Sequence, residues 1–422
     1  MVKLLLDNYI SRKKLMINID FYTKNFRWLY IVFILTFCSA FGQTFFISLY
    51  SAEIRNTFNL SHGEWGLIYS TATLASAVII LFVGGYADKV SAKVMSCTVI
   101  IGLMCFILAM ANNNSYMFLI LIILGLRFFG QGMLGHLAMV YCGKWFSKNR
   151  GKAIAVANSG YTLAEASLPT VFVILMGLFA WKATWYISLI TSSIILFTIF
   201  GFLTSERNKK APDKAGTTQA GMKNKSWTRG EMLGSWVFWV AFPGLMACPM
   251  STTTLFFHQV HLVNIKNWEM SEFVILIPFY SATSLFSLYF FGYLVDKFNT
   301  KNILPFFLFP LIVGFATLAN ATSYISLMIV FILLGLKQGA YSVVYGTFFP
   351  EFFGTKNLAS IRTVGLAIMV FSSAVGPVLS GYFIDLGYDI DEQFKIMAYF
   401  GIFASALNLV ITLKIKLPKT VE

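Results

Sequence analysis

Two stretches of the sequence, GGYADKVSAK at residues 84–93 and FGYLVDKFNTK at residues 291–301, carry the same pattern of glycine, aspartate and lysine. The residues that recur 208 positions apart are Gly84, Asp88, Lys89 and Lys93, matched by Gly292, Asp296, Lys297 and Lys301. The loops ANNNSY (111–116) and ANATSY (319–324) share this offset, and GLR (125–127) returns as GLK 210 positions later. Because these three matches occur in the same order along both halves of the chain, they predict two parallel repeats related by an axis along the membrane normal.

Outward from these loops, the chain is dominated by apolar runs. Of the 422 residues 57% are hydrophobic and 12% charged, and the mean hydropathy is +0.72. A spanning helix needs about 20 mostly apolar residues, and twelve such runs can be placed. They cover roughly residues 28–50, 66–87, 95–111, 116–141, 153–180, 185–203, 234–257, 272–294, 303–319, 324–349, 358–384 and 396–413. The sequence therefore predicts an all-α membrane protein of twelve transmembrane helices in two pseudo-symmetric six-helix bundles.

One long polar segment divides these spans into six and six. It covers residues 204–230 and mixes charge with Gly, Ala, Thr and Pro, which is typical of a linker. The predicted organisation is a basic N-terminal segment (1–27), an N-terminal bundle (28–203), the linker (204–230), a C-terminal bundle (231–413) and a tail (414–422).

The basic residues predict the orientation of the spans. With both termini in the cytoplasm, 25 of the 32 Lys and Arg residues fall in cytoplasmic segments. The outer loops hold four, and three lie within spans: Arg127, Lys337 and Arg362. Because short cytoplasmic loops are rich in Lys and Arg, we expect an integral plasma-membrane protein, in a bacterial inner membrane, with both termini inside. The net charge of +14 is thus attributed to the cytoplasmic segments of a membrane protein rather than to a nucleic-acid-binding surface.

The repeated loop resembles the signature G-x-x-x-D-[RK]-x-G-[RK]-[RK] of the major facilitator superfamily, although Ser91 and Ala92 replace its second glycine and one basic position. The resemblance implies the major facilitator fold and a carrier that works by alternating access. Carboxylates and ammonium groups at helix ends can pair with neighbouring helices and hold one face shut. Both copies are therefore predicted to form gate latches, although a capped basic turn would explain either copy alone.

A second resemblance covers residues 127–169, where RFFGQG precedes KWFSKNRGKAIAVANSGYTLAEASLP. It is similar to helices 4 and 5 of bacterial members near the monocarboxylate and oxalate/formate porters. The usual R-x-x-Q-G is shifted here to Arg127-x-x-Gly130-Gln131-Gly132. The shift weakens the transfer of a proton-relay role to Arg127, which only the alternative of an exporter assigns to it. Small residues recur at helical spacing at Ala153, Ala157, Gly160 and Ala164, which also suits close helix packing.

Ionisable groups deep in the spans are the candidate site, because each costs about 2.5–3.5 kcal/mol on insertion scales. Glu165 lies at a depth similar to that of Arg127, so an internal pair of the two is one interpretation. No span of the second half carries an acid near its centre to pair with Lys337. The resemblance implies that Arg127 and Lys337 face each other across the central path, where two cations could clamp an anion. The alternative is that Lys337 snorkels or bonds a backbone carbonyl.

Polar neighbours at helical spacing complete the predicted substrate site. These substrate-binding candidates are Arg127, Lys337, Gln43, Gln131, Tyr341 and Tyr345, with Glu165 as the candidate for proton coupling. The three histidines His136, His258 and His261 are interpreted as ordinary lining or interfacial residues.

The predicted function is secondary active transport of a small organic anion, by proton symport or by exchange. The alternative is a proton-driven exporter of amphipathic compounds, and a non-transporting membrane sensor is a third reading. Neither a phosphate-binding G-x-x-x-x-G-K-[ST] loop nor a hydrolase motif occurs, so no enzyme activity, cofactor, metal or nucleic-acid partner is expected. The five cysteines form no C-x-x-C pair and are interpreted as packing residues. The expected partners are a small-molecule substrate and the lipid bilayer, with a monomer as the functional unit.

Overall fold

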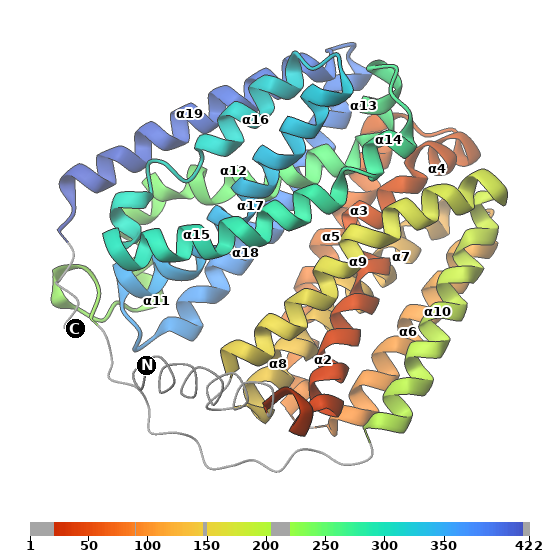
Figure 1. Cartoon of the computed structure of the whole chain (residues 1–422), viewed down its shortest axis with the longest axis horizontal. Helices are drawn as coiled ribbons and strands as arrows, with labels where there is room; N and C mark the ends of the chain where they lie inside the picture. The colour runs from red at the N-terminus through yellow and green to blue at the C-terminus, as the bar shows by residue number, and fades with distance from the viewer. Residues whose placement is uncertain (1–20, 89, 147–149, 204–219, 417–422) are drawn as a thin grey trace, which may run out of the picture.

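A computed structural model describes residues 21–88, 90–146, 150–203 and 220–416, and all regular structure within these ranges is helical. The basic segment 1–27, the linker 204–230 and the tail therefore lie partly outside the described residues. Figure 1 shows two groups of long helices, one red to yellow and one green to blue. We call them the N-terminal group (α2 to α10) and the C-terminal group (α11 to α19).

Every predicted span contains a helix of the structure. In the N-terminal group the elements are α2 (Phe26–Cys38), η1 (Ser39–Gly42), α3 (Thr44–Ile47), η2 (Ser48–Tyr50), α4 (Ser51–Phe58), α5 (His62–Val83), η3 (Gly84–Asp88), α6 (Ala92–Asn112), α7 (Tyr116–Gly125), η4 (Leu126–Leu134), α8 (Gly135–Trp145), α9 (Arg150–Leu178) and α10 (Trp181–Phe202). In the C-terminal group they are η5 (Met222–Asn224), α11 (Arg229–Leu233), α12 (Trp236–Phe257), α13 (Gln259–Ile265), α14 (Met270–Val274), α15 (Ile277–Ile303), α16 (Phe309–Ala319), α17 (Tyr324–Phe353), α18 (Leu358–Asp385) and α19 (Ile390–Lys414).

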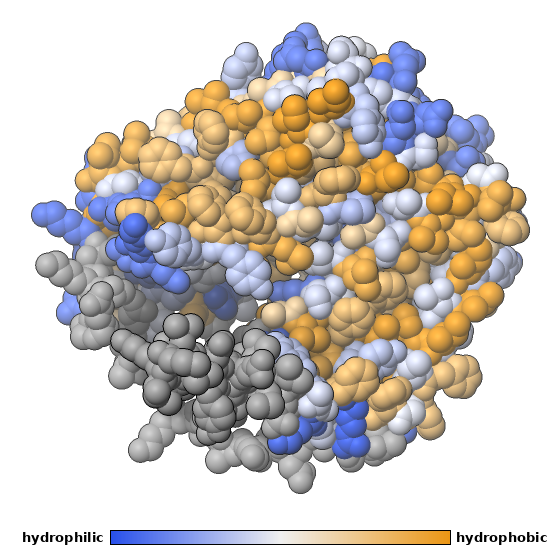
Figure 2. All heavy atoms as spheres, in the orientation of Figure 1, coloured by the Kyte–Doolittle hydropathy of each residue, from blue (hydrophilic) through white to orange (hydrophobic). Residues whose placement is uncertain are grey.

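Membrane-length helices dominate the described chain. Ten are long and apolar enough to cross a bilayer, and the bent pair of segments 26–42 and 44–58 makes an eleventh. The remaining predicted span contains α16, which has 11 residues. Figure 2 shows hydrophobic side chains over the sides of both groups, among them Phe82, Phe197 and Tyr289, each more than 70% exposed. Such a surface is stable in lipid rather than in water.

The first span is broken at Gly42 and Gln43, where the two parts meet at 45°. Gln43 adopts an extended backbone conformation between η1 and α3. A Cβ atom at Gly42 would lie 2.1 Å from the carbonyl oxygen of Leu126 and 2.8 Å from Cα of Gly130, so only glycine allows this approach of η1 to η4. The break frees backbone groups that need partners inside the membrane, and this places a polar site midway along the bundle.

Small residues bring helices together as their spacing predicted. Ala153, Ala157 and Ala164 of α9 are buried, and a Cβ atom at Gly160 would lie 2.1 Å from the carbonyl oxygen of Phe33 in α2. Thr36 of α2 also donates a hydrogen bond to the carbonyl of Ala157 at 2.5 Å. The close packing of α2 on α9 is therefore confirmed.

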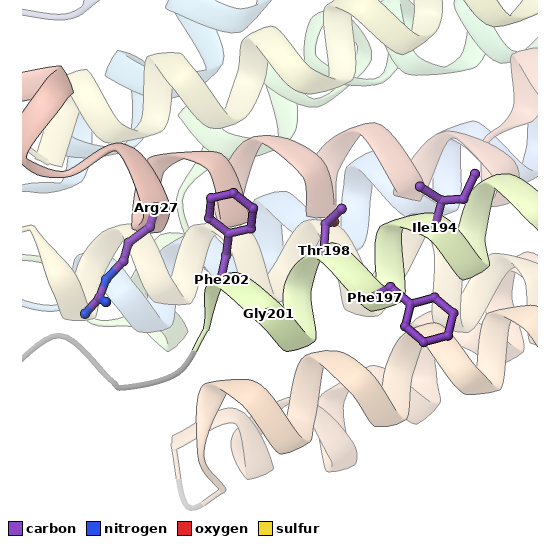
Figure 3. Close-up of a pocket in the computed structure, with 6 residues that line it drawn as sticks. All are labelled: Arg27, Ile194, Phe197, Thr198, Gly201 and Phe202. Carbon is purple, nitrogen blue, oxygen red and sulfur yellow. The ribbon is translucent and has the colours of Figure 1, made fainter.

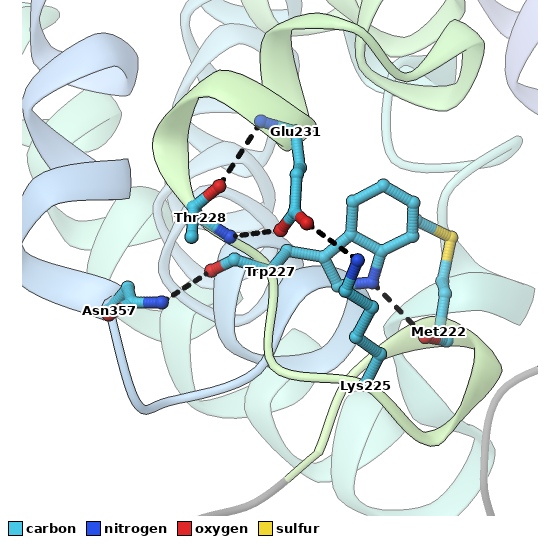
Figure 4. Close-up of polar contacts among 6 residues, drawn as sticks. All are labelled: Met222, Lys225, Trp227, Thr228, Glu231 and Asn357. Carbon is cyan, nitrogen blue, oxygen red and sulfur yellow. Dashed lines mark hydrogen bonds and ion pairs between the residues drawn. The ribbon is translucent and has the colours of Figure 1, made fainter.

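The last part of the predicted linker is folded rather than irregular. Trp227 donates its backbone N–H to Phe353 at 3.0 Å and its indole N–H to the Met222 carbonyl at 3.1 Å. Asn357 donates to the Trp227 carbonyl at 2.9 Å, and Glu231 forms an ion pair with Lys225 at 2.6 Å (Figure 4). The segment is thereby fastened to the turn between α17 and α18.

The two groups touch at one end of the molecule. Hydrogen bonds between them join Ser61–Gly63 to Asp385, Ser70 to Ala374, Ser51 to Phe257, Gln259 to Phe45 and Ser48, Thr170 to Val274, and Glu165 to Ser281. We call the end that carries Ser61 and Asp385 the contact end. Toward the opposite end, where α5 and α18 reach residues 83 and 358, the described residues of the two groups share no such bond. The helices therefore diverge from the contact end (Figure 1).

Candidate functional site

Arg127 is buried at the break of the first span, in the π-helical segment η4, with 1% of its surface exposed. Its Nε donates to Thr73 Oγ1 at 3.0 Å, and its Nη1 donates to the Gly42 carbonyl at 3.1 Å and to Thr44 Oγ1 at 3.4 Å. The guanidinium also lies 5.0 Å from the ring centre of Tyr69. Arg127 thus satisfies a carbonyl that the helix break leaves without a helical partner.

The interpretation that Arg127 pairs with Glu165 is wrong. Within the described residues, the hydrogen bonds of Arg127 go to the first two spans of its own group. Glu165 of α9 instead accepts from Tyr161 at 3.0 Å and from Ser281 of α15 at 3.3 Å. Glu165 is 8% exposed. Its acidic group therefore lies at the boundary between the two groups and not inside the N-terminal one.

Lys337 of α17 is equally buried, with 1% of its surface exposed, but forms fewer hydrogen bonds. Within the described chain its ammonium donates one hydrogen bond, to Thr252 of α12. Its charge interacts with that of Glu165 across the boundary, although no ion-pair contact joins them. No span of the second half supplies this acid, as the sequence indicated, because Glu165 belongs to the other group.

Tyr341 and Tyr345 extend the site along α17. Their rings lie 5.6 Å apart, and the Tyr341 hydroxyl is buried with no hydrogen-bond partner in the structure. A buried polar group without a partner costs about 1–3 kcal/mol, so this hydroxyl is available to a ligand. Tyr345 is half-buried and points its hydroxyl toward Gly365 of α18.

Gln43 and Gln131, in contrast, form no hydrogen bond with Arg127 in the described part of the chain. Both are half-buried, and the neighbours of Gln43, Gly42 and Thr44, bind the guanidinium instead. Gln131 lies four residues after Arg127, one turn along an α-helix, but η4 is π-helical and follows an i to i+5 pattern. Their assignment as substrate ligands stays a prediction.

The structure describes less of the first latch sequence than of the second. Lys89 and the side chain of Asp88 lie outside the described residues. Gly84 accepts a hydrogen bond from His136 at 3.2 Å if that nitrogen carries the proton, and the Lys93 ammonium lies 3.6 Å from the ring centre of Phe200. In the second copy Gly292 and Lys301 are half-buried, and Asp296 and Lys297 are exposed. Asp296 lies near Glu351, which accepts from the Thr300 backbone and hydroxyl.

The residues that sequence reasoning missed are Tyr161, Ser281, Thr252 and Thr73. Each carries a side-chain hydroxyl group within a span. Many such groups bond only the backbone of their own helix, so the residue type alone does not mark a site. Tyr161 did carry a signal, because it precedes Glu165 by one helical turn.

A groove of about 640 Å³ lies outside this site, between α10 and the start of α2. It is lined by Arg27, Ile194, Phe197, Thr198, Gly201 and Phe202 (Figure 3). Its phenylalanines belong to the exposed apolar surface, so the groove faces lipid rather than the centre. Among the described residues, no group of three or more His, Cys, Asp or Glu side chains is placed to hold a metal ion.

Membrane-length helices in two groups, with charged side chains buried at their centre, are the architecture of a membrane transport protein. The sequence model of the Major Facilitator Superfamily matches residues 32–319 and again residues 259–421. The chain therefore belongs to the Major Facilitator Superfamily. It is a transporter and not an enzyme, and the predicted fold class is confirmed.

Solved structures share this fold at low sequence identity. A bacterial homologue of the human lysosomal transporter Spinster, in an inward-facing and occupied conformation, superposes with a TM-score of 0.70 at 16% identity over 93% of this chain and 97% of that one. The nucleoside transporter NupG gives a TM-score of 0.67 at 15% identity over 92% of this chain and all of NupG. No curated protein sequence matches the chain.

Proposed function

We propose that this chain is a secondary active transporter of a small organic anion, bound by Lys337 and coupled to protons through Glu165. The observation that supports it best is the environment of Lys337. An ammonium has three donors, yet the buried Lys337 uses one of them in the structure, beside the unpartnered hydroxyl of Tyr341. A carboxylate placed there would accept from both groups, and such charge-assisted bonds are the strong ones.

Glu165 suits the coupling role because it lies between the groups. When ionised it attracts Lys337 across the boundary and accepts from Ser281. Protonation removes that attraction, and a substrate anion at Lys337 competes for the same cation. Either event weakens a link between the two groups, which is how binding can drive a change of conformation.

In this proposal Arg127 has a structural role, whereas its place in the repeat suggests that it binds substrate as Lys337 does. Because three hydrogen bonds join Arg127 to Gly42, Thr44 and Thr73, we infer that it holds the first and second spans in place. Gln43 and Gln131 remain candidates to line the path beside it, and affiliation with monocarboxylate or oxalate/formate porters remains part of the proposal.

The orientation follows from the basic loops. The end opposite the contact end carries Lys144, Lys225 and Lys414, so the count of Lys and Arg favours the cytoplasm there. We infer that the structure corresponds to an inward-facing conformation, in an inner membrane with both termini in the cytoplasm. The two Gly-x-x-x-Asp-Lys loops at this end would then act as latches in the outward-facing conformation, and the carrier would function as a monomer.

Binding of carboxylates to the purified protein tests the proposal. A charge-assisted hydrogen bond contributes roughly 1.5–3 kcal/mol, so Lys337→Gln should weaken binding about ten- to a hundredfold, measured by thermal shift or calorimetry. Lys395→Gln, which removes a charge from an exposed position of α19, is the matched control and should bind normally. If Lys337→Gln binds and transports every substrate at wild-type affinity, the anion assignment is wrong, and export of amphipathic compounds becomes the better hypothesis.

A further inference from the structure

Three of the four histidines in the chain meet at the contact end, where the proposed function gives them no role. His62 begins α5 in the N-terminal group, whereas His258 and His261 lie at the end of α12 and in α13 of the C-terminal group. The ring centres of His62 and His261 are 4.4 Å apart, and those of His62 and His258 are 6.0 Å apart. The cluster therefore spans the boundary between the two groups (α4 and α13 in Figure 1 mark the place).

The cluster surrounds the point where α5 is bound to α18. Asp385 accepts from the Ser61 hydroxyl at 2.7 Å and from the backbone N–H groups of Gly63 at 2.7 Å and His62 at 3.0 Å. A carboxylate thus caps the positive end of a helix of the other group. His258, 3% exposed, has Nε2 3.1 Å from the Pro377 carbonyl of α18, and Gly66 of α5 packs on that same carbonyl.

The charges that face the rings come from several elements. Arg55 of α4 repels a proton on each of the three rings. Asp385 favours a charged His62, but its oxygens already accept three bonds from the start of α5. Asp389, in the turn after α18, favours a charged His261. Burial lowers the pKa of His258 to about 3, and burial with Arg55 lowers the pKa of His261.

We propose that His62, His258 and His261 form a proton-operated lock on the contact end, closed when the rings are neutral and released when they are protonated. Each added proton places a positive charge beside Arg55 and beside the other rings. The charges repel, and separating the groups restores water to them. The proton acting here is distinct from the one proposed for Glu165, so this lock does not depend on the anion assignment.

The direction of the pH dependence follows from the sign of the pKa change. A histidine exposed by separation titrates near 6.5, above its pKa in the closed arrangement. The contribution to closure is therefore fully present above about pH 6.5 and is lost as the pH falls toward the lower value. Between pH 7.5 and 5.0, His258 alone should change the ratio of closed to open molecules roughly thirtyfold.

Spin labels across the contact end test the lock directly. Asn56 of α4 and Asn264 of α13 are exposed on opposite sides of the boundary, and distances between labels there can be measured in lipid discs without substrate. In a cysteine-free background the wild type should show one short distance at pH 7.5 and a growing long-distance population at pH 5.0. A variant with His62→Gln, His258→Gln and His261→Gln should lose this response. His136→Gln, which changes the histidine at the opposite end, should retain the response to pH, even where the loss of its contact to Gly84 shifts the populations equally at both pH values.

Because His258 is buried, the triple variant could fail for lack of folding, which size-exclusion chromatography of the purified protein would reveal. His261→Gln alone changes a half-buried residue and should reduce the long-distance population at pH 5.0. The proposal is overturned if the wild-type distances are the same at both pH values. It is overturned equally if folded His261→Gln, or the folded triple variant, responds like the wild type. Neither result would alter carboxylate binding at Lys337, so the two proposals fail separately.

Discussion

Arg127 and Lys337 occupy equivalent places in the two repeats, yet their surroundings differ. Arg127 donates three hydrogen bonds to two neighbouring spans and lies against Tyr69. Lys337 donates one, to Thr252. Both side chains are 1% exposed, so the difference lies in the partners and not in access to water. The same position in a repeated fold thus bonds two neighbouring spans in one half and a single hydroxyl in the other.

The cause of this difference is the break in the first span. Gly42 and Gln43 interrupt the helix beside Arg127 and leave a carbonyl for it to bind. The equivalent span beside Lys337 is α12, which is helical from Trp236 to Phe257 despite Pro243 and Pro249. A planar guanidinium with five donors suits several acceptors at once, whereas an ammonium acts as a single charge.

The largest effect is expected for Arg127→Gln. It leaves three buried acceptors without their donor, and each buried polar group left unsatisfied costs about 1–3 kcal/mol. Thermal unfolding of the purified protein should show a much lower midpoint, and Arg127→Lys should recover little of it because an ammonium lacks the fork. Adding Glu165→Gln should not restore stability, since the two side chains are not paired. Restoration by the double change would contradict the structure and revive the internal pair.

The next effect concerns coupling through Glu165. Glu165→Gln should abolish the acceleration of uptake by a proton gradient in vesicles while exchange of substrate continues. It should also raise the affinity for carboxylates severalfold, because the competing negative charge near Lys337 is gone. Tyr161→Phe removes one donor to Glu165 and leaves its charge, so it should keep the proton dependence. Uptake that still follows the proton gradient in Glu165→Gln would exclude this residue as the coupling group.

A smaller effect is expected for substitutions in the two latch sequences. Asp88→Asn and Asp296→Asn should each slow transport several times more than they weaken substrate binding, because the loops bias a conformational equilibrium and do not touch the ligand. Initial uptake rates and binding constants of the same variants provide the comparison. Wild-type rates in both variants would remove the latch role, and an effect in only one would show that the two repeats differ here as they do at Arg127 and Lys337.

Hydropathy and charge were sufficient to predict the spans, because the bilayer imposes helix length and apolar composition on every crossing. The family was predicted from the repeated Gly-x-x-x-Asp-Lys loop. The partners of Arg127 could not be predicted, since they depend on a helix break and a glycine contact between distant segments. The pair of Arg127 and Glu165, one of the interpretations of the sequence, is not formed, because Glu165 binds Tyr161 and Ser281. Depth along one helix does not determine the direction a side chain takes, and Glu165 points to α15 rather than to η4.

The π-helical segment η4, Leu126–Leu134, has a mechanical consequence. Such a segment holds one residue more than an α-helix of equal length would. If that residue moved out of the π-helical turn, the helix beyond it would rotate by about 100° relative to the part before it. The helix that follows this segment is α8, which carries His136 and its contact to Gly84 of the latch sequence. The extra residue therefore couples the hydrogen-bond register at the centre of the fourth span to the direction in which side chains point at its end.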